Sequence, residues 1–531
     1  MKTLFISSLL LLSACANDKS GTGDTGHTSV TTDDTAANDT GEPPSLVNIT
    51  SFVANIDPDC SVCGTATIEL DTPAPLTLLV GSSGEPPVDW VKMDAASSHQ
   101  IPVLQLRADT TYELIARIND GTDAVVESDS ISLTTGPLPD DLPFMELTSN
   151  EELETQPGLT LFAVARWTPI AEEDWNYLVA VDAQGNVVWY RFLEGFGIGL
   201  HVDEQSRIYS TETALTALRI DPFGQTSAEW TMADLGYDTA HHEVLGLPDD
   251  GMAIMSSELR TVEGWVDETT GIELDFDVVG DLLVTFDSNG EATWEWSMLD
   301  HFDPIEHHTI DMHGTFWMRP PYMDVEAPKD WSHGNAMVAN DGGWLGSYRN
   351  LDWLVQVDPN TDEVEWVLGP EGDFELASGG RWFSRQHAPE IQENGNILLY
   401  DNGNARADAE VGEQPWSRVV EYQLDHETNI ATEVWSWDGG ERYFCPIVGD
   451  VNRLENDNMI ITDGAIANGS NVVDGITIAH FSSRIREITT TDTPEVAWEL
   501  TIGHPGQIEL NGYTVYRAIR FPSLYPPNAR P

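Results

Sequence analysis

Short apolar runs alternate with acidic, glycine-containing turns along most of the chain. From residue 144 onward one unit recurs, in which an apolar run leads into a turn of Asp, Gly or Asn and then into a short run ending in tryptophan. The six copies are residues 177–182 with Trp189, 217–221 with Trp230, 282–287 with Trp294, 353–358 with Trp366, 419–425 with Trp435 and 484–488 with Trp498. Because the turn residues allow a tight reversal and the tryptophan can cover a sheet face, each copy is predicted to be a β-hairpin.

A second kind of hairpin is interleaved with the first. Its copies cover residues 242–255, 333–348, 387–400 and 451–462. Two hairpins make a four-stranded sheet, and six such sheets around an axis make a β-propeller. No amphipathic helical stretch of useful length interrupts the pattern. We therefore expect an all-β protein whose residues 144–531 form a six-bladed β-propeller.

A smaller domain is predicted before the propeller. Residues 46–137 carry short alternating runs separated by Gly, Pro and Asp, a spacing typical of a small N-terminal β-sandwich. A proline-containing linker follows it, up to Pro143. Within this domain Cys60 and Cys63 form a CxxC, which favours a local disulfide, whereas Cys445 stands alone in the propeller.

The first fifteen residues have the layout of a secretory signal. Lys2 precedes an apolar run, residues 4–12, that is too short to span a bilayer and leads into Leu-Ser-Ala-Cys. This ending resembles a bacterial lipobox, in which the thiol of Cys15 is acylated; a plain signal peptide with an incidental cysteine is the alternative. Residues 16–45 contain almost no large apolar side chain and are expected to form a disordered tether.

These features predict an extracytoplasmic lipoprotein. The chain has no later apolar stretch long enough to span a bilayer, so the N-terminal lipid is the only membrane attachment that we expect. The predicted location is the cell envelope, in the periplasm or at the outer membrane.

The charge balance limits the partners. The chain has 89 acidic and 24 basic residues, a formal net charge of −65. Nucleic acid is excluded because its phosphates need basic patches, and anionic membrane surfaces would repel the chain. The charge is interpreted as solvation in a salt-rich habitat. The sequence leaves open whether copies of the chain form a homo-oligomer.

Three histidines fall at nearly one register of three successive predicted blades. His242, His333 and His387 each lie eight or nine residues before the glycine of the following turn. Because the first strand of each blade lines the channel of a propeller, we expect the three side chains to converge on one opening. Asn335 and Arg349 lie close to them in the sequence. Imidazole is an acid–base group and a nucleophile near neutral pH, and guanidinium matches oxyanions, so the set predicts an anion site.

Several segments, taken in order, resemble the successive motifs of bacterial arylsulfotransferases. They are residues 241–243 (His-His-Glu), 247–249, 330–335 (Asp-Trp-Ser-His-Gly-Asn), 347–350 (Ser-Tyr-Arg-Asn), 383–387 (Phe-Ser-Arg-Gln-His), 394–399, 401–404 and 516–517. The resemblance covers most of the chain from Asp174 onward. The family is also similar in having a small N-terminal β-domain before its propeller.

The resemblance implies a reaction and a set of site residues. The implied enzyme is an aryl-sulfate sulfotransferase that needs no nucleotide sulfate donor, no cofactor and no metal. It passes a sulfuryl group from an aryl sulfate to a phenol by a ping-pong route through sulfohistidine. By position in the motifs, His387 is the nucleophile, and the further catalytic or substrate-binding residues are His333, His242, Arg349, Asn335, His241 and Thr462. Either His241 or His242 matches the upstream histidine of the family, and the register with His387 favours His242.

Three positions depart from the family pattern. Ala388 follows the nucleophilic histidine where the family commonly has an acidic residue, so another group has to hold the tautomer of the ring. The variable position of the His-x-Asn motif is Gly334. Cys445 has no nearby cysteine with which to form the disulfide known near the active site of some members.

Three other interpretations compete with sulfotransfer. A non-catalytic propeller would serve as a binding or scaffold lipoprotein. A quinoprotein dehydrogenase is suggested by residues 355–358 leading to Trp366, although that fold normally needs eight blades and adjacent cysteines. A divalent-metal site in the long insertion is the third, based on His301, His307, His308 and His313.

Overall fold

The computed structural model describes residues 47–119, 125–166, 175–195, 197–266, 271–308, 316–317, 320–406, 408–473, 476–503 and 512–530. The predicted signal, Cys15 and the tether lie outside these residues. Within them the chain is β-structure, with two four-residue α-helices, α1 (Met232–Leu235) and α2 (Met298–His301). The prediction of an all-β protein is confirmed. None of the helices that the model describes is long and apolar enough to cross a membrane.

The first strands form one six-stranded sheet. The strands are β1 (Ile49–Ile56), β2 (Gly64–Ser82), β3 (Val88–Val103), β4 (Thr111–Asn119), β5 (Val125–Glu127) and β6 (Ile131–Thr134). The long strand β2 pairs with β3 along one edge and with β1 and then β4 along the other. Cys60 and Cys63 form a disulfide in the loop before β2, as the CxxC spacing predicts.

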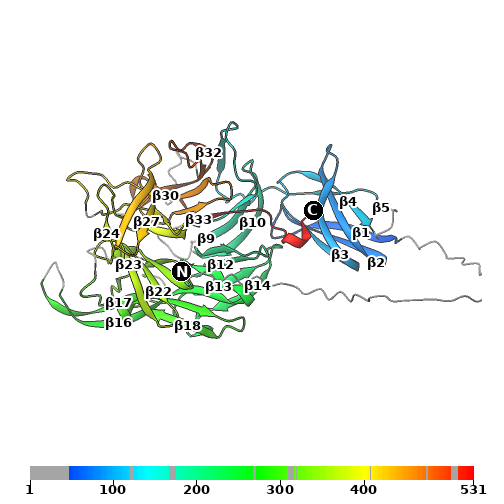
Figure 1. Cartoon of the computed structure of the whole chain (residues 1–531). Coiled ribbons are helices and arrows are strands. Elements are labelled where there is room, and N and C mark those ends of the chain that lie inside the picture. The colour runs from blue at the N-terminus through cyan, green and yellow to red at the C-terminus, as the bar shows by residue number, and fades with distance from the viewer. Residues whose placement is uncertain are drawn as a thin grey trace, which may run out of the picture. The chain divides into compact units, whose positions relative to one another are not determined.

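The remaining strands form six further sheets of four or five strands each (Figure 1). The first sheet contains β8 (Leu159–Arg166), β9 (Trp175–Val181), β10 (Val187–Glu194) and β33 (Tyr513–Phe521). The second contains β11 (Leu200–Val202), β12 (Ile208–Thr213), β13 (Thr216–Ile220) and β14 (Thr226–Thr231). The third contains β15 (Val244–Gly246), β16 (Met252–Val266), β17 (Glu273–Phe286), β18 (Ala292–Ser297) and β19 (Lys329–Asp330). The fourth sheet contains β20 (Gly334–Asn340), β21 (Gly343–Tyr348), β22 (Trp353–Asp358) and β23 (Glu363–Leu368). The fifth contains β24 (Glu375–Leu376), β25 (His387–Ile391), β26 (Ile397–Asp401), β27 (Arg418–Asp425) and β28 (Ile430–Trp437). The sixth contains β29 (Asp450–Arg453), β30 (Met459–Val473), β31 (Ile476–Ile488), β32 (Val496–Ile502) and β7 (Met145–Ser149).

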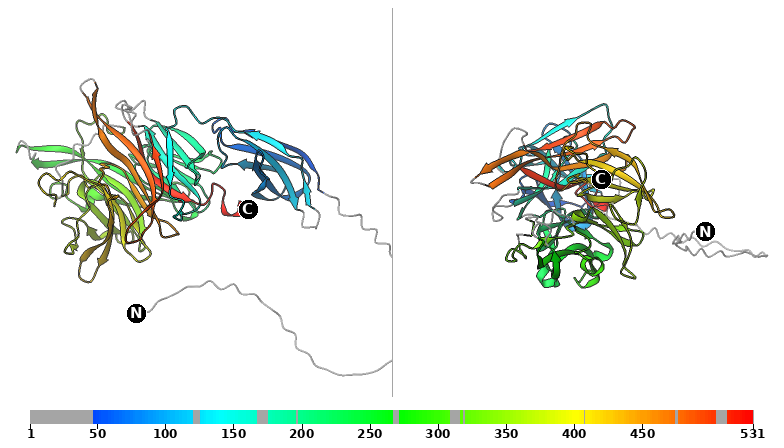
Figure 2. Two further views of the ribbon diagram at one scale, coloured as in Figure 1. Left: turned by 90° about the horizontal axis from the view of Figure 1, so that it is seen from above. Right: turned by 90° about the vertical axis from the view of Figure 1, so that its left-hand side faces the viewer.

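The inner strands of these sheets follow one another in a closed cycle, which in the third sheet passes from β15 to the second strand, β16. β11 contacts β15, β16 contacts β20, β20 contacts β25, β25 contacts β29, β29 contacts β33, and β33 contacts β11. The cycle closes because the C-terminal strand β33 pairs with β8, while β7 pairs with β32 at the outer edge of the last sheet. The fold is therefore β-propeller-like (Figures 1 and 2).

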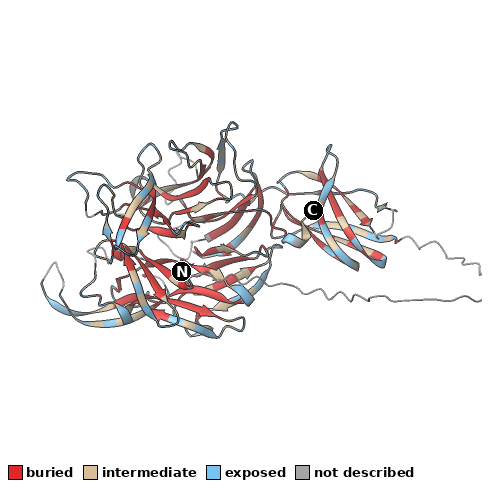
Figure 3. Cartoon of the chain, viewed as in Figure 1, coloured by how far each residue is buried: buried red, intermediate tan, exposed pale blue. Residues whose placement is uncertain are grey.

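The predicted hairpins correspond to paired strands. The unit that ends in tryptophan gives the pairs β9/β10, β13/β14, β17/β18, β22/β23, β27/β28 and β31/β32. In the first copy the carboxylate of Asp182 accepts hydrogen bonds from the backbone N–H groups of Gln184 and Asn186, and Gly185 has a positive φ of 77°. Trp189 is fully buried. Buried residues lie mainly on the strands and exposed ones toward the hairpin ends (Figure 3).

Replacing a buried aromatic of the first sheet should measure the stability that this packing provides. Phe162 in β8 is fully buried, so Phe162→Ala should lower the free energy of unfolding by about 3–5 kcal/mol. Phe223→Ala, at a turn position where the side chain is 41% exposed, should change the free energy of unfolding by less than about 1 kcal/mol. Urea denaturation of both variants checks this; equal losses would place Phe162 outside the core.

Candidate active site

Four aromatic rings from four innermost strands meet in the interior. His242 lies just before β15, His333 just before β20, His387 begins β25, and Tyr516 belongs to β33. The ring centroids of His242 and His333 are 5.1 Å apart, and Tyr516 lies 5.6 Å from His242 and 5.9 Å from His387. The structure therefore brings together the three histidines that share a register in the sequence.

The backbone around these rings is strained. His242, His333, Arg385 and Ala388 have positive φ values of 60°, 49°, 58° and 46°. For residues with a Cβ this left-handed region costs about 1–2 kcal/mol each, and such residues cluster at functional sites. Local hydrogen bonds oppose the strain; for example, the N–H of Arg385 donates to Asp352 over 2.6 Å. The chain holds these side chains in orientations that a regular strand would not give.

The imidazole of His387 has a defined tautomer. Asn402 donates its side-chain N–H groups to the carbonyls of Cys445 and Val448, over 2.8 and 2.7 Å. The amide oxygen of Asn402 therefore faces Nδ1 of His387, 2.7 Å away, and the carbonyl of Arg385 is 3.1 Å from the same nitrogen. Since both neighbours are acceptors, Nδ1 carries the hydrogen and Nε2 has a free lone pair.

Burial keeps this ring uncharged. His387 is 2% exposed, and burial, reinforced by the nearby Arg349 guanidinium, lowers its pKa to about 3. At neutral pH the ring is therefore a neutral imidazole with an available Nε2, the form required of a nucleophile.

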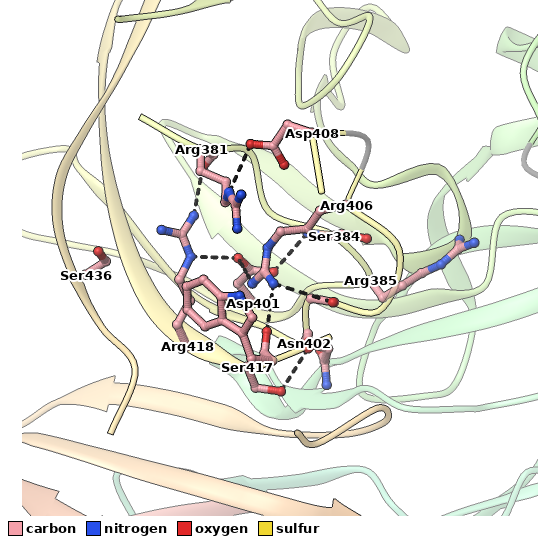
Figure 4. A network of polar contacts seen from close by, with 12 residues as sticks. Arg381, Ser384, Arg385, Asp401, Asn402, Arg406, Asp408, Ser417, Arg418 and Ser436 are labelled. Atoms are coloured by element: carbon pink, nitrogen blue, oxygen red, sulfur yellow. Dashed lines mark hydrogen bonds and ion pairs between the residues drawn. The ribbon is translucent and has the colours of Figure 1, made fainter. Parts of the chain in front are cut away.

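A buried ion-pair network holds Asn402 in place (Figure 4). The preceding residue, Asp401, is fully buried and accepts hydrogen bonds from the N–H of Ser384 and from Arg406 and Arg418, over 2.8 to 2.9 Å. Ser417 donates to the carbonyl of Asn402 over 2.8 Å. Asn402, whose side-chain amide orients His387, is therefore held by the hydrogen bond to its own carbonyl and by the partners of the preceding residue, Asp401.

Arg349 provides the cation of the site. It begins a short 3₁₀ turn, η3 (Arg349–Leu351), and its backbone N–H donates to the carbonyl of His333 over 3.1 Å. Its guanidinium donates to Asn350 and to the carbonyl of Pro446 over 2.9 and 3.2 Å. Its charge contributes to lowering the pKa of both His387 and His242, which places it within electrostatic reach of the two rings.

His333 is paired with a buried carboxylate. Its Nδ1 lies 2.6 Å from Oδ2 of Asp330, and Trp317 donates to the other oxygen of that carboxylate over 2.9 Å. Burial alone would raise the pKa of Asp330, but His333 and Arg349 lower the pKa overall. Phe316 lies 4.9 Å from His242 and 5.0 Å from His333 between ring centroids, so an aromatic side chain covers the two histidines.

The other predicted site residues lie at varied places. His241 lies behind His242, with their Nδ1 atoms 2.7 Å apart. Asn335 donates to the carbonyl of Gln386 over 2.7 Å, and its own carbonyl accepts the hydroxyl of Tyr516 over 2.5 Å. Thr462 is buried in β30 opposite Asp450, and its hydroxyl makes no hydrogen bond among the described residues.

Arg517, the last residue of the family motifs, contacts carboxylates at the N-terminal ends of two other strands, β15 and β29. It donates to both carboxylate oxygens of Glu243 over 2.6 and 2.9 Å, and its Nε lies 3.7 Å from Asp450. Burial raises the pKa of Asp450 to about 6 even though Arg517 opposes this change. The contacts tie β33 to the residues before β15 and to β29.

The histidines of the insertion pack separately against aromatic rings. His301 stacks on Trp296 at 4.6 Å, His307 lies 5.2 Å from Trp353, and His308 lies 4.8 Å from Trp265. His313 lies outside the described residues. Across the part of the chain that the structure describes, no group of three or more His, Cys, Asp or Glu side chains is arranged to hold a metal ion.

The sequence alone predicted no role in the site for four residues that contact the histidines there. They are Asn402, Phe316, Asp330 and Tyr516. Asn402 lies 15 residues after His387, directly after β26, the strand that pairs with β25. The signal that points to it is the missing acid at Ala388, which requires another acceptor for Nδ1 of His387.

The fold and these contacts define a class of protein: a β-propeller-like protein with a buried centre of histidines and arginine suited to an anionic group. The arylsulfotransferase (ASST) family model matches residues 145–509, more than half of the chain. The chain belongs to the arylsulfotransferase family. This membership supports an aryl sulfotransferase activity on aryl sulfates and phenols, and it disfavours a scaffold protein or a quinoprotein dehydrogenase.

Comparisons with individual proteins are more distant. No curated protein matches the chain. Among solved structures, the chain is similar to a subtype N11 neuraminidase-like protein of A/flat-faced bat/Peru/033/2010 (H18N11), with 9% identity, a TM-score of 0.31, and coverage of 70% of this chain and 96% of that chain. It is also similar to apo AztD from Citrobacter koseri, with 12% identity, a TM-score of 0.23, and coverage of 84% and 99%. Neither likeness informs the function.

Removing the amide that orients His387 should impair turnover while the imidazole of His387 is kept. In Asn402→Ala the Nδ1 hydrogen loses its main acceptor, the other tautomer becomes accessible, and kcat should fall by about 10²- to 10⁴-fold. Selective ¹⁵N labelling of histidine should show the Nδ1–H tautomer of His387 in the unsubstituted protein and a mixture in the variant. Unchanged turnover would show that Asn402 does not orient the ring.

The lowered pKa of His387 predicts a pH-dependent stability. An unfolded histidine titrates near about 6.5, whereas the folded ring titrates near 3, so the unfolded chain binds an extra proton between these values. The free energy of unfolding should therefore fall as the pH falls below about 6.5, by up to about 1.4 kcal/mol per pH unit from this ring. The difference in the free energy of unfolding between pH 7 and pH 5, measured by urea denaturation, should be smaller in His387→Gln than in the unsubstituted protein. An equal difference in both proteins would contradict the prediction.

Proposed function

We propose that the chain transfers a sulfuryl group from an aryl sulfate ester to a phenolic acceptor, in two half-reactions, through a sulfohistidine at His387. No nucleotide sulfate is required. The observation that carries the proposal is the buried, neutral His387, whose Nε2 is left free by the contact between Nδ1 and Asn402. Membership of the arylsulfotransferase family supports the class of substrate.

In the first half-reaction Nε2 of His387 attacks the sulfur of the ester. The bond from sulfur to the phenolic oxygen breaks, and a bond from sulfur to Nε2 forms. The departing phenolate takes a proton from a protonated histidine, His242 or His333, which becomes neutral. In the second half-reaction an acceptor phenol gives up its proton to the same histidine, and its oxygen takes the sulfuryl group from His387. The proton balance is then restored.

The protein contributes positioning and charge. As in phosphoryl transfer, the transferring group is expected to be loosely bonded to both sides in the transition state, with its negative charge spread over the oxygens. Arg349 supplies positive charge beside His387, and loss of one such donor costs on the order of 3 kcal/mol in the transition state. Proton donation by a histidine to the leaving phenolate contributes roughly 10²- to 10⁴-fold. Asn335 holds the backbone before His387 through the carbonyl of Gln386.

We also infer the finer architecture. The six sheets whose inner strands form a closed cycle are interpreted as six propeller blades. The N-terminal sheet is interpreted as a small sandwich, because β2 exchanges β1 for β4 along one edge and can thus pass from one layer to the next.

The location is proposed as extracytoplasmic, with Cys15 lipidated at the cell envelope. The sequence supports this through the signal-like first fifteen residues. The disulfide between Cys60 and Cys63 is in keeping with an oxidising compartment.

Trapping the intermediate tests the proposed function. Incubation with 4-nitrophenyl sulfate alone should add the mass of one sulfuryl group, and peptide mapping should place it at His387. Added phenol should then remove the adduct and yield phenyl sulfate. His387→Ala should abolish adduct and transfer, whereas His426→Ala, at an exposed turn position, should retain both. An adduct on His242 or His333, or transfer by His387→Ala, would overturn the assignment.

A further inference from the structure

Two polar side chains continue the site behind His242, away from His387. They are His241, on the adjacent position of the chain, and Asp281, in β17. We propose that Asp281, His241 and His242 form a proton relay, in which the proton exchanged with the phenolic oxygen is stored on His241 beside Asp281. The inference rests on the proposed function and names the proton carrier of the same site.

The contacts determine where the hydrogens lie. Nε2 of His241 is 3.2 Å from the carbonyl of Ser256, to which it donates, and 3.1 Å from Oδ1 of Asp281. Both neighbours are acceptors, so this nitrogen carries a hydrogen. The Nδ1 atoms of His241 and His242 are 2.7 Å apart, and only one hydrogen fits between them. In the neutral pair, therefore, Nδ1 of His242 donates to Nδ1 of His241, and Nε2 of His242 is free to accept a proton.

The environments of the two rings differ. His242 is buried among His241, His333, His387 and Arg349, and burial together with these neighbours lowers its pKa well below the usual value. A positive charge on His242 is therefore costly. His241, by contrast, has a carboxylate oxygen at 3.1 Å. When Nε2 of His242 takes the proton of an acceptor phenol, its Nδ1 hydrogen moves to Nδ1 of His241, and the charge is placed beside Asp281. The reverse movement, from His241 to Nδ1 of His242 and from Nε2 of His242 to the phenolic oxygen, delivers the stored proton to the next departing phenolate.

Asp281 is held ready for this role. It is 1% exposed, and its Oδ2 accepts hydrogen bonds from the hydroxyl of Ser332 and the N–H of Gly334, over 2.5 and 2.6 Å. Its Oδ1 accepts no hydrogen bond among the described residues, although it is buried and lies against His241. A buried carboxylate oxygen without a donor is costly unless a positive charge is formed beside it.

The same arrangement accounts for glycine in the His-x-Asn motif. A Cβ at position 334 would lie 2.9 Å from Cγ of Asp281 and 2.5 Å from the sulfur of Met255. The carboxylate thus occupies the space that a side chain at this position would need. Gly334 and Asp281 are therefore a matched pair, and the departure from the family pattern has a steric reason.

A relay is needed most when the leaving phenolate is strongly basic. Phenyl sulfate releases such a phenolate and depends on proton donation, whereas 4-nitrophenyl sulfate releases a phenolate that carries its charge without help. In Asp281→Asn the amide oxygen takes the place of Oδ2, which accepts from Ser332 and Gly334, and the NH₂ group takes the place of Oδ1. Nε2 of His241 then faces a hydrogen-bond donor instead of a carboxylate oxygen, so a positive charge on His241 is no longer stabilised. The variant should lose about 10²-fold in kcat/KM with phenyl sulfate and less than about 10-fold with 4-nitrophenyl sulfate.

Matched variants separate the relay from a structural role. His241→Gln leaves the hydrogen bonds from Ser332 and Gly334 to Asp281 intact, should show the same donor-dependent loss, and serves as the test if Asp281→Asn does not fold. The double variant should lose no more than either single variant, since one chain of proton transfer is broken. Asp277→Asn, on the same strand and bonded to Thr261, should leave both rates unchanged. Equal losses with both donors, or full additivity, would overturn the relay.

Failure of the relay can be told apart from failure of the proposed function. If the unsubstituted protein forms no sulfuryl adduct at His387, the function itself is wrong. The adduct can instead form from 4-nitrophenyl sulfate in both the unsubstituted protein and Asp281→Asn. If Asp281→Asn then lowers kcat/KM equally for phenyl sulfate and 4-nitrophenyl sulfate, only the relay is wrong.

Discussion

The pairing of β33 with β8 holds the two ends of the series of sheets together. It supplies the first sheet with its innermost strand and completes the cycle of inner strands. The same strand carries Tyr516, whose ring lies between His242 and His387 and whose hydroxyl holds the carbonyl of Asn335. Closure of the fold and assembly of the site therefore depend on one set of hydrogen bonds. Because β8 and β33 are far apart in the chain, with the strands of five sheets between them, this contact is costly in chain entropy and is stable only once the intervening sheets have formed.

The site must attract an anion within a strongly acidic chain. A formal charge of −65 repels an aryl sulfate at long range, but salt confines that repulsion to about 8 Å at physiological ionic strength. Inside the site the balance is reversed: Arg349 is positive, while His242 and His387 are kept neutral by burial. The carboxylates of Asp330 and Asp281 lie on the far sides of His333 and His241. Selectivity for an anion is therefore a property of a few buried groups and not of the surface.

Local patterns in the sequence predicted much of this arrangement. The Asp-Gly turns and following tryptophans marked the hairpins, and the shared register of His242, His333 and His387 anticipated that their rings would lie near one another. The pairings that close the fold had no local signal, because β7 and β32, like β8 and β33, are far apart in the chain. Asn402 and Asp281 act from neighbouring strands, so their roles follow only from three-dimensional contacts. Motif order alone also placed Thr462 among the site residues, although its hydroxyl makes no hydrogen bond among the described residues.

The partner of His387 is an amide, and this affects the lifetime of the sulfohistidine that we propose. A carboxylate at the same place would pull the Nδ1 hydrogen toward itself and make the ring a stronger electron donor. Asn402 accepts that hydrogen without a charge, so the ring remains a weaker base. On the proposed route a weaker base is a slower attacker of the ester and a better leaving group from sulfur. The sulfuryl group should therefore be passed on readily once an acceptor binds, so that during turnover with both substrates most of the enzyme is unmodified.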